Sequence, residues 1–438
     1  MNVELRQVKT EAEQALSVTF KDARAALPGK GDVAKLREDA FSRFEARGLP
    51  HRRVEEWKYT DLRTLMRTAY PLAAPPDAAA LTRAQQISGL FAGVDRQRLV
   101  FIDGVFAPDL SDLTEDAEEG VSIGSLAAAL AKADPLVMAH VGKTVATDDV
   151  AVALNTALMG DGAVIRIGAG VTPHRPIHLI FAASNDRPQA SYVRSLIVVE
   201  KGAQATIIES HEQLSAQVNS AVELVVGDEA RVDYIRTARG RGLQIATLLA
   251  SVGAGATFNT FAFAADAELV RNQAFIRFAG ENTTAGLRGV SLLRNKDHVD
   301  NTLLIEHAAA NCQSREQFRA VLDNDAHSVF QGKIVVKQHA QKTDAKMLTR
   351  ALLLSETAEA YSKPELEIFA DDVVCGHGAT AGALDPGLKF YLMARGIPEQ
   401  EAEALLIQAF IGETVEEIAH EGIREALIVA SLKWLGAR

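Results

Sequence analysis

The run Cys375-Gly376-His377-Gly378 carries the residue types best suited to bind a metal. Thiolate sulfur and imidazole nitrogen are the ligands that iron, zinc and iron–sulfur centres prefer. On a β-strand, residues two apart point to the same face, so the Cys375 and His377 side chains would emerge together. The flanking glycines carry no side chain, which would let a cluster or another backbone approach closely.

Two donors make only half of a closed metal site, which needs about four ligands. The neighbouring sequence offers no other cysteine. The remaining ligands must therefore come from far along the chain or from a partner. The alternative is that Cys375 is a buried core residue and His377 a hydrogen-bonded one, because free cysteine is among the most buried residue types. The residues alone leave both interpretations open.

Other candidate ligands indicate no compact site. Four histidines fall within one stretch, at spacings that match no compact metal motif but could stack in a repetitive fold: His298, His307, His327 and His339. Each taken singly is more often a surface or hydrogen-bonded residue. The second cysteine, Cys312, is expected to be structural, with redox activity as the alternative. No P-loop, nucleophile-elbow or His-Glu-x-x-His motif is present in the sequence.

The composition is typical of a globular protein in a reducing compartment. Of 438 residues, 47% are hydrophobic and 24% are charged. The net charge of −11 disfavours nucleic-acid binding. Two cysteines are too few for a disulfide framework. The first residues lack the apolar segment of a signal peptide, and no apolar run reaches membrane-spanning length, which predicts a cytoplasmic protein.

Residues 1–97 are predicted to form an N-terminal helical region. Within it, residues 35–47 have apolar positions at helical spacing and are followed by a Gly-Leu-Pro stop. The next run is dense in charged and aromatic residues. We expect Trp57 and Tyr59 to anchor a loop there while the charges pair at the surface. Residues 71–80 have the Pro/Ala composition of a linker.

Residues 98–380 have β character and an internal repeat. Copies of one turn, two of them looser, place alanines at Ala203, Ala230, Ala256, Ala326 and Ala358. The first three are 27 and 26 residues apart (230 − 203 and 256 − 230). A period of this size with two or three short strands per unit predicts a stacked parallel β-helix. An antiparallel sandwich would also give short strands, but it would not easily repeat one turn at a fixed period.

Residues 381–438 return to helical character. One helix is expected from Pro398 and a second over residues 421–434. Their apolar stripes contain Ala402, Leu405, Leu406, Ala409 and Phe410 in the first helix and Ile423, Leu427, Ala430 and Trp434 in the second. Such stripes predict either a cap on the end of the solenoid or a docking face for a partner. The sequence leaves these two roles open.

A series of motifs runs through the second half of the chain. They occupy residues 330–334, 340–345, 350–355, 364–368, 371–380 and 390–397. Together with residues 55–62 near the N-terminus, they closely resemble the SufB/SufD family of iron–sulfur cluster assembly proteins. The resemblance implies a right-handed parallel β-helix between helical terminal regions, in agreement with the repeat.

Two features place the resemblance in the SufD branch. SufB-type chains carry a cysteine a few residues after the counterpart of residues 350–355, where this chain has Glu356-Thr357-Ala358-Glu359-Ala360. They also have a Glu-His-Glu grouping in place of Gly376-His377-Gly378. The resemblance therefore implies a non-catalytic partner subunit and not a complete scaffold or an enzyme.

By this resemblance the chain works in a SufB–SufC–SufD complex. SufC subunits are ATPases that bind the C-terminal helices of SufB and SufD, and a nascent cluster forms at the SufB–SufD interface. His377 matches the functional histidine of the family and Cys375 a nearby cysteine. Both are expected to contribute to a transient iron–sulfur cluster shared with the SufB-type partner. Neither nucleic acid nor membrane is expected as a partner, and the isolated chain could form a homodimer.

Two other function classes remain open from the sequence. One is a β-helix enzyme that acts on polysaccharides, which would need carboxylates clustered beside a groove of the solenoid. The acids of this sequence lie mainly in turns. The other is a purely structural partner in which Cys375 and His377 have no metal role.

Overall fold

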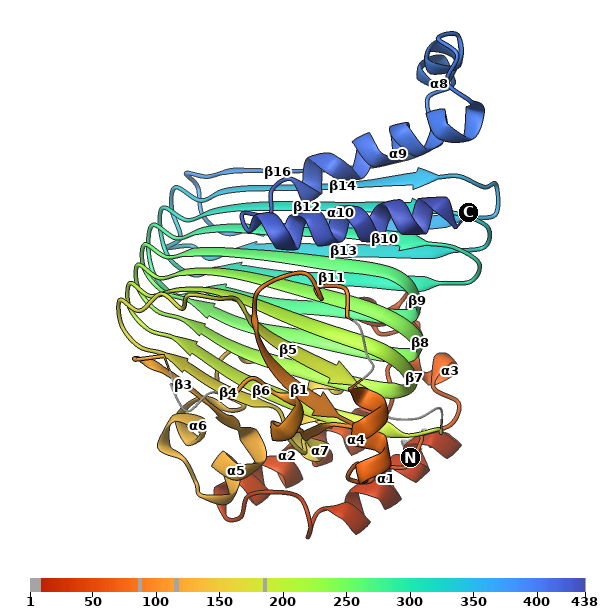
Figure 1. Ribbon diagram of the computed structural model, residues 1–438. Coiled ribbons are helices and arrows are strands. Elements are labelled where there is room, and N and C mark those ends of the chain that lie inside the picture. The colour runs from red at the N-terminus through yellow and green to blue at the C-terminus, as the bar shows by residue number, and fades with distance from the viewer. Residues whose placement is uncertain (1–8, 86–88, 114–117, 184–186, 438) are drawn as a thin grey trace, which may run out of the picture.

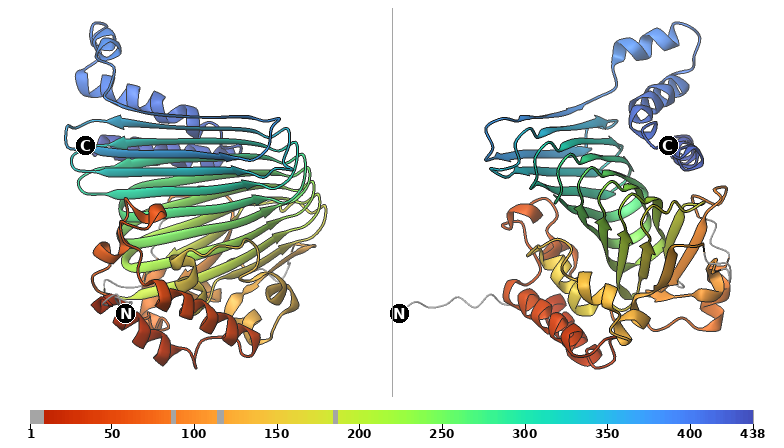
Figure 2. Two further views of the ribbon diagram at one scale, coloured as in Figure 1. Left: turned by 180° about the vertical axis from the view of Figure 1, so that it is seen from behind. Right: turned by 90° about the vertical axis from the view of Figure 1, so that its left-hand side faces the viewer.

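The computed structural model describes residues 9–85, 89–113, 118–183 and 187–437. It shows a tall stack of β-strands with helices contributed by both ends of the chain (Figure 1). The N-terminal helices lie against the first turns of the stack, and the C-terminal helices lie beside its last turns (Figure 2). None of the helices in these ranges combines the length and the apolar character that crossing a bilayer requires.

The N-terminal region is helical, as predicted. Its elements are α1 (Glu11–Ala23), α2 (Asp32–Arg47), the short 3₁₀ helix η1 (Glu55–Trp57), α3 (Leu62–Leu65) and α4 (Ala78–Ala84). Helix α1 begins with a capping box, in which Thr10 and Glu13 satisfy each other's backbone N–H groups. Phe20 of α1 stacks on Phe41 of α2, with ring centres 4.1 Å apart, and this contact holds the two helices together.

The next segment mixes short strands with helices. Its elements are β1 (Gln97–Ile102), β2 (Val105–Phe106), η2 (Pro108–Leu110), β3 (Val121–Ser125), α5 (Leu126–Ala131), α6 (Pro135–His140), α7 (Val150–Leu158), β4 (Ala163–Ile167) and β5 (Ile177–Ala182). The three helices interrupt the stretch whose sequence has β character. Every residue of α7 is buried. A short, mostly apolar helix that is buried on all sides has no clear amphipathic period, so the sequence pattern does not distinguish it from a buried strand.

The rest of the core is a parallel β-helix, which confirms the predicted fold class. Its strands are β6 (Ala190–Val199), β7 (Gln204–Val226), β8 (Arg231–Val252), β9 (Thr257–Phe278), β10 (Thr284–Leu293), β11 (His298–His307), β12 (Gln313–Leu322), β13 (His327–Val336), β14 (Asp344–Leu353), β15 (Glu359–Ile368) and β16 (Val374–Gly382). In one sheet β10, β12, β14 and β16 pair in parallel, and in the other β11, β13 and β15 do so. The long strands β7, β8 and β9 run through both sheets.

The recurring alanines mark one corner of the β-helix. Each turn passes this corner through a residue with left-handed backbone, at φ between 59° and 67°: Gly202, Glu229, Gly255, Asn282, Asn311 and Lys342. Glycine and asparagine tolerate this conformation best. The residues that follow are small and at most 1% exposed: Ala203, Ala230, Ala256, Thr283, Cys312 and Thr343. Cys312 therefore fills a packing position that alanine or threonine fills in other turns, which supports its structural role.

The two looser copies of the turn lie at the opposite corner. Ala326 lies between β12 and β13, and Ala358 lies between β14 and β15. The interior between the corners is one apolar cluster that runs from β1 to β14. The outer face of one sheet carries α1, α2 and α7, and the outer face of the other carries the C-terminal helices.

The C-terminal helices are α8 (Pro386–Met393), α9 (Glu399–Val415) and α10 (Glu421–Gly436). Helices α9 and α10 lie along the flank of the β-helix (Figure 1), and α8 projects beyond it. Ile423, Leu427 and Trp434 are at most 1% exposed and pack in one cluster with Phe261 and Phe263 of β9. The stripe of α10 therefore covers one sheet of the β-helix, and docking of a partner on the C-terminal helices stays a prediction.

The aromatic residues after α2 fasten the N-terminal region to the β-helix, as expected. Trp57 is 2% exposed, and its Nε1 donates a hydrogen bond to Asp149 over 3.0 Å. Tyr59 stacks on Tyr361 of β15, with ring centres 5.0 Å apart. Lys363 of β15 pairs with Glu55. We call residues 55–60 the strap, because they lie across the outer faces of successive strands.

Candidate functional site

Cys375 and His377 lie on β16, the last strand of the β-helix (Figure 1). Cys375 stands opposite Ala345 of β14, and His377 stands opposite Met347. Ala345 and Met347 belong to the interior cluster. Because alternate residues share a face, Cys375 and His377 both face the interior at the end of the stack. In the part of the chain that the structure describes, β16 pairs only with β14 and β15 only with β13, so this last turn is open.

The two candidate ligands differ in exposure. Cys375 is half-buried and packs against the interior cluster, whereas His377 is exposed. Burial raises the pKa of the Cys375 thiol, and the nearby Asp344 and Glu316 carboxyls raise it further. The thiol is therefore protonated in the free chain at neutral pH. A bound cation would displace that proton, because the thiolate is the metal ligand.

The glycines beside His377 leave the outer face of β16 bare. A methyl group added at Gly376 would meet no atom within 4 Å, and one added at Gly378 would meet only the side chain of Leu348, at 3.3 Å. Neither glycine is among the described residues with positive φ, so the backbone does not require glycine here. Their effect is therefore steric, since another chain could approach the strand at these two positions without meeting a side chain.

The described residues contain no group of three or more His, Cys, Asp and Glu side chains arranged to hold a metal ion. Of the four histidines that could stack in a repetitive fold, only two lie next to each other. His298 and His327 are neighbours on the outer face, with ring centres 6.1 Å apart. His307 is buried inside the β-helix, and His339 lies in a turn where Nε2 contacts the carbonyl of Ala308. The open end therefore presents two donors and not a closed site.

Exposed apolar side chains lie at the open end of the stack and also on the projecting helix α8. At the end of the stack, Ile368, Phe369 and Val374 are 41%, 59% and 62% exposed. Helix α8 contains no buried residue. Its large side chains Leu388, Phe390, Tyr391 and Met393 are all exposed. Several exposed apolar side chains on one short element, as on α8, are typical of sites that bind another protein.

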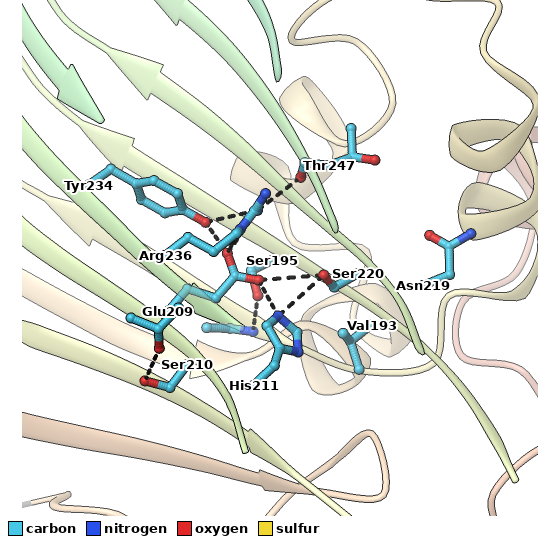
Figure 3. A network of polar contacts seen from close by, with 12 residues as sticks. Val193, Ser195, Glu209, Ser210, His211, Asn219, Ser220, Tyr234, Arg236 and Thr247 are labelled. Carbon is cyan, nitrogen blue, oxygen red and sulfur yellow. Dashed lines mark hydrogen bonds and ion pairs between the residues drawn. The ribbon is translucent and has the colours of Figure 1, made fainter. Parts of the chain in front are cut away.

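A polar network inside the first turns of the β-helix was not anticipated from the sequence (Figure 3). Glu209 of β7 is fully buried and contacts Arg236, Tyr234 and His211. Burial would raise the pKa of Glu209, but the Arg236 charge and the hydrogen bonds from its partners lower it to about 2. The carboxylate is thus ionised and compensated, as a structural ion pair requires. The available signal was the two-residue spacing of Glu209 and His211, which places both on one face of a strand.

Two protein-family models together match most of the chain. The model described as the SufBD protein N-terminal region matches residues 11–179, and the one described as the SUF system FeS cluster assembly SufBD core domain matches residues 180–410. Their common border falls inside the stretch that the sequence analysis assigns to the β core.

Curated relatives match over nearly the full length. An iron–sulfur cluster assembly SufBD family protein from Synechocystis is 31% identical over 426 residues, which cover 94% of this chain and 93% of the relative. The iron–sulfur cluster assembly protein SufD of Escherichia coli is 30% identical over 389 residues, covering 87% and 88% of the two chains. The SufD of Bacillus subtilis is 30% identical over 297 residues, covering 63% and 64%.

Proposed function

We propose a function from the premise that this chain belongs to the SufBD family of iron–sulfur cluster assembly proteins. The function is that of a SufD-type subunit, a non-catalytic partner in a complex with a SufB-type scaffold and SufC-type ATPases. The chain contributes Cys375 and His377 to a nascent cluster that forms where it meets the SufB-type partner. The matched family gives no support to the polysaccharide-active enzyme.

One observation carries this proposal: among the described residues, the open last turn presents two candidate donors and no third. A thiol and an imidazole face the same side of the terminal strand, and no described group of three donors surrounds them. Two donors cannot close a site that needs about four ligands. Half a ligand set at an unpaired strand edge, beside exposed apolar side chains, suits a cluster shared with a second chain. The same edge could pair with a second copy of this chain in isolation.

A shared site also suits the chemistry of assembly, in which the cluster is cargo to be built and then released. Ligands divided between two subunits are separated when the subunits move apart, so a movement at the interface changes the affinity for the cluster. Nucleotide binding to SufC-type subunits could supply that movement, because a ligand shifts a conformational equilibrium by its differential affinity for the two states. The exposed apolar face of α8 is the surface we assign to the ATPase.

The test is anaerobic co-purification of the chain with SufB-type and SufC-type partners, followed by iron and sulfide analysis. His377→Ala should leave the complex intact and lower its iron and sulfide content strongly. Cys375→Ala should have a smaller effect, because a thiolate of the partner can replace it. The matched control is His174→Ala, since His174 has a 90% exposed side chain far from β16 in the sequence. Unchanged iron and sulfide in His377→Ala would contradict the proposal.

A further inference from the structure

The β-helix interior contains a second buried glutamate, Glu316 of β12, with surroundings unlike those of Glu209. Its side chain is fully buried and shares the interior face with Phe318 two residues later. In register, Glu316 stands opposite Met347 of β14, and Met347 stands opposite His377 of β16. The three residues thus form one row on successive strands, with Glu316 two strands below His377. Strands in a sheet lie about 4.8 Å apart, so the two backbones are separated by about 10 Å.

The carboxyl of Glu316 has no compensating charge inside the β-helix. Neither oxygen has a hydrogen-bond partner of ordinary geometry among the described residues. Ser314, on the same face, lowers the pKa of Glu316 against the larger effect of burial, but its hydroxyl is also in contact with His307 Nε2 over 3.1 Å. Nδ1 of His307 is also buried without a partner. A buried polar atom without a partner is costly, so these atoms call for a functional explanation.

Few titratable or charged groups face Glu316. On its own strand the charge of Arg315 lowers the pKa of Glu316. From β11 His307 faces the same interior, and from β16 the groups are Cys375 and His377. The facing residues of β10, β13, β14 and β15 are apolar or small, including Leu287, Phe330, Met347 and Leu366. Burial dominates and raises the pKa of Glu316 to about 8, so that at neutral pH the group is mostly a neutral acid.

We propose that Glu316 holds a proton while the last turn is empty and releases it when a divalent cation binds at Cys375 and His377. This inference rests on the ligand role in the proposed function and extends it to a residue that would not touch the cation. A positive charge bound on β16, two strands from Glu316, favours the carboxylate form, because opposite charges attract and Glu316 itself is fully buried. The Glu316 carboxylate, two strands further into the β-helix, then offsets part of the cation's charge.

The step balances without any transfer of electrons. When the divalent cation binds, the Cys375 thiol loses a proton and becomes a cation-bound thiolate. The Glu316 carboxylic acid loses a second proton and becomes a carboxylate, and both protons pass to the solvent. The contrast with Glu209 gives the reason for the arrangement. Glu209 has Arg236 as a permanent counter-charge, whereas the counter-charge of Glu316 would be present only while the site is loaded.

The first experiment counts protons released when Co²⁺ binds to the purified full-length chain without oxygen at pH 7. Thiolate-to-cobalt absorption reports binding at Cys375, and a Cys375→Ala variant should lose that absorption. Wild type should release about two protons per bound ion, and Glu316→Gln should release about one. The control Glu356→Gln, an exposed glutamate in the turn before β15, should release as many as wild type. Equal counts in wild type and Glu316→Gln would overturn the inference.

The second experiment needs no metal, so its outcome does not depend on the proposed function. A carboxyl whose pKa is raised in the folded state stabilises the fold less as pH rises from its unfolded value, about 4.5, to about 8. Wild type should lose stability over this window by more than Glu316→Gln or the volume-conserving Glu316→Met does. Identical pH dependence in wild type and in whichever variant folds would overturn the inference. A wild-type chain that binds no Co²⁺ would overturn this inference alone, because the proposed cluster also takes ligands from the SufB-type partner. Iron and sulfide analysis of the assembled complex tests the proposed function separately.

Discussion

The guanidinium of Arg271 lies over the indole of Trp57, 3.8 Å from the ring centre. The two residues are 214 positions apart (271 − 57), and their contact joins the strap to β9. Arg271 also donates to the carbonyl of Glu56 over 2.8 Å and pairs with Asp300 of β11. The N-terminal region is therefore fastened to the middle of the β-helix by a buried cation that has an aromatic ring, a carbonyl and a carboxylate as partners.

Removing the indole should destabilise this attachment. Trp57→Ala would leave a cavity and uncover the Arg271 guanidinium, and we expect a loss of about 3–5 kcal/mol in the free energy of unfolding. Denaturant unfolding followed by circular dichroism would measure it. The control Trp57→Phe keeps an aromatic face and should lose less. A Trp57→Ala protein as stable as wild type would show that the strap does not contribute to stability.

The His377 side chain should matter little for folding. It is exposed at an open edge, so His377→Ala should change the free energy of unfolding by less than about 1 kcal/mol. His307→Ala offers the contrast, because His307 is fully buried and packs edge-on against Phe278, with ring centres 4.5 Å apart. It should cost clearly more in the same thermal or denaturant experiment. A strongly destabilised His377→Ala chain would mean that His377 is a core residue.

The ATPase-binding face should lie on α8 and not on the stripe first expected. Phe390→Ser changes a side chain that is 71% exposed, so it should abolish co-purification of the ATPase while stability stays unchanged. The control Val18→Ser alters a side chain of α1 that is 59% exposed and should have no such effect. Leu427→Ala should instead destabilise the fold by about 2–5 kcal/mol, because Leu427 is buried against the sheet. Full recovery of the ATPase with Phe390→Ser would contradict the assignment.

Acid should weaken the fold through His178. Arg96 Nε donates to Nδ1 of His178, which fixes the proton on Nε2 beside Ser210. Burial, together with Arg96 and Arg98, lowers the pKa of His178 to about 3. Stability from this group is fully present above its unfolded pKa, about 6.5, and is lost as pH falls toward 3, by roughly 4 kcal/mol at most. His178→Gln should flatten the fall in unfolding free energy over that window. An unchanged slope would refute this.

Cys312 should be replaceable by the residue that other turns carry at its corner. Ala203, Ala230 and Ala256 occupy the equivalent position, so Cys312→Ala should cost no more than about 1 kcal/mol. The same variant should leave the iron and sulfide content of the assembled complex unchanged. A Cys312→Ala complex that loses its iron would instead give the buried thiol a role in the chemistry.

The sequence alone predicted those features that depend on residues close together in the chain. The two-residue spacing of Cys375 and His377 predicted that both share one face of a strand, which the register with Ala345 and Met347 confirms. The recurring alanine predicted the β-helix, because each turn must pass the same corner with a small buried residue. The amphipathic period predicted α2, α9 and α10 close to their observed bounds.

Only the tertiary structure decided which distant residues meet. Glu316 and His377 are 61 residues apart (377 − 316), and they share a row because the lengths of the intervening turns set the register of β12, β14 and β16. The apolar stripe of α10 can be identified in the sequence, but the sequence does not show whether the stripe packs against the sheet or binds a partner. The sequence by itself thus determined the family, the β-helix and the pair of candidate ligands. Parallel stacking decided what lies beneath that pair, because register depends on every turn between the strands.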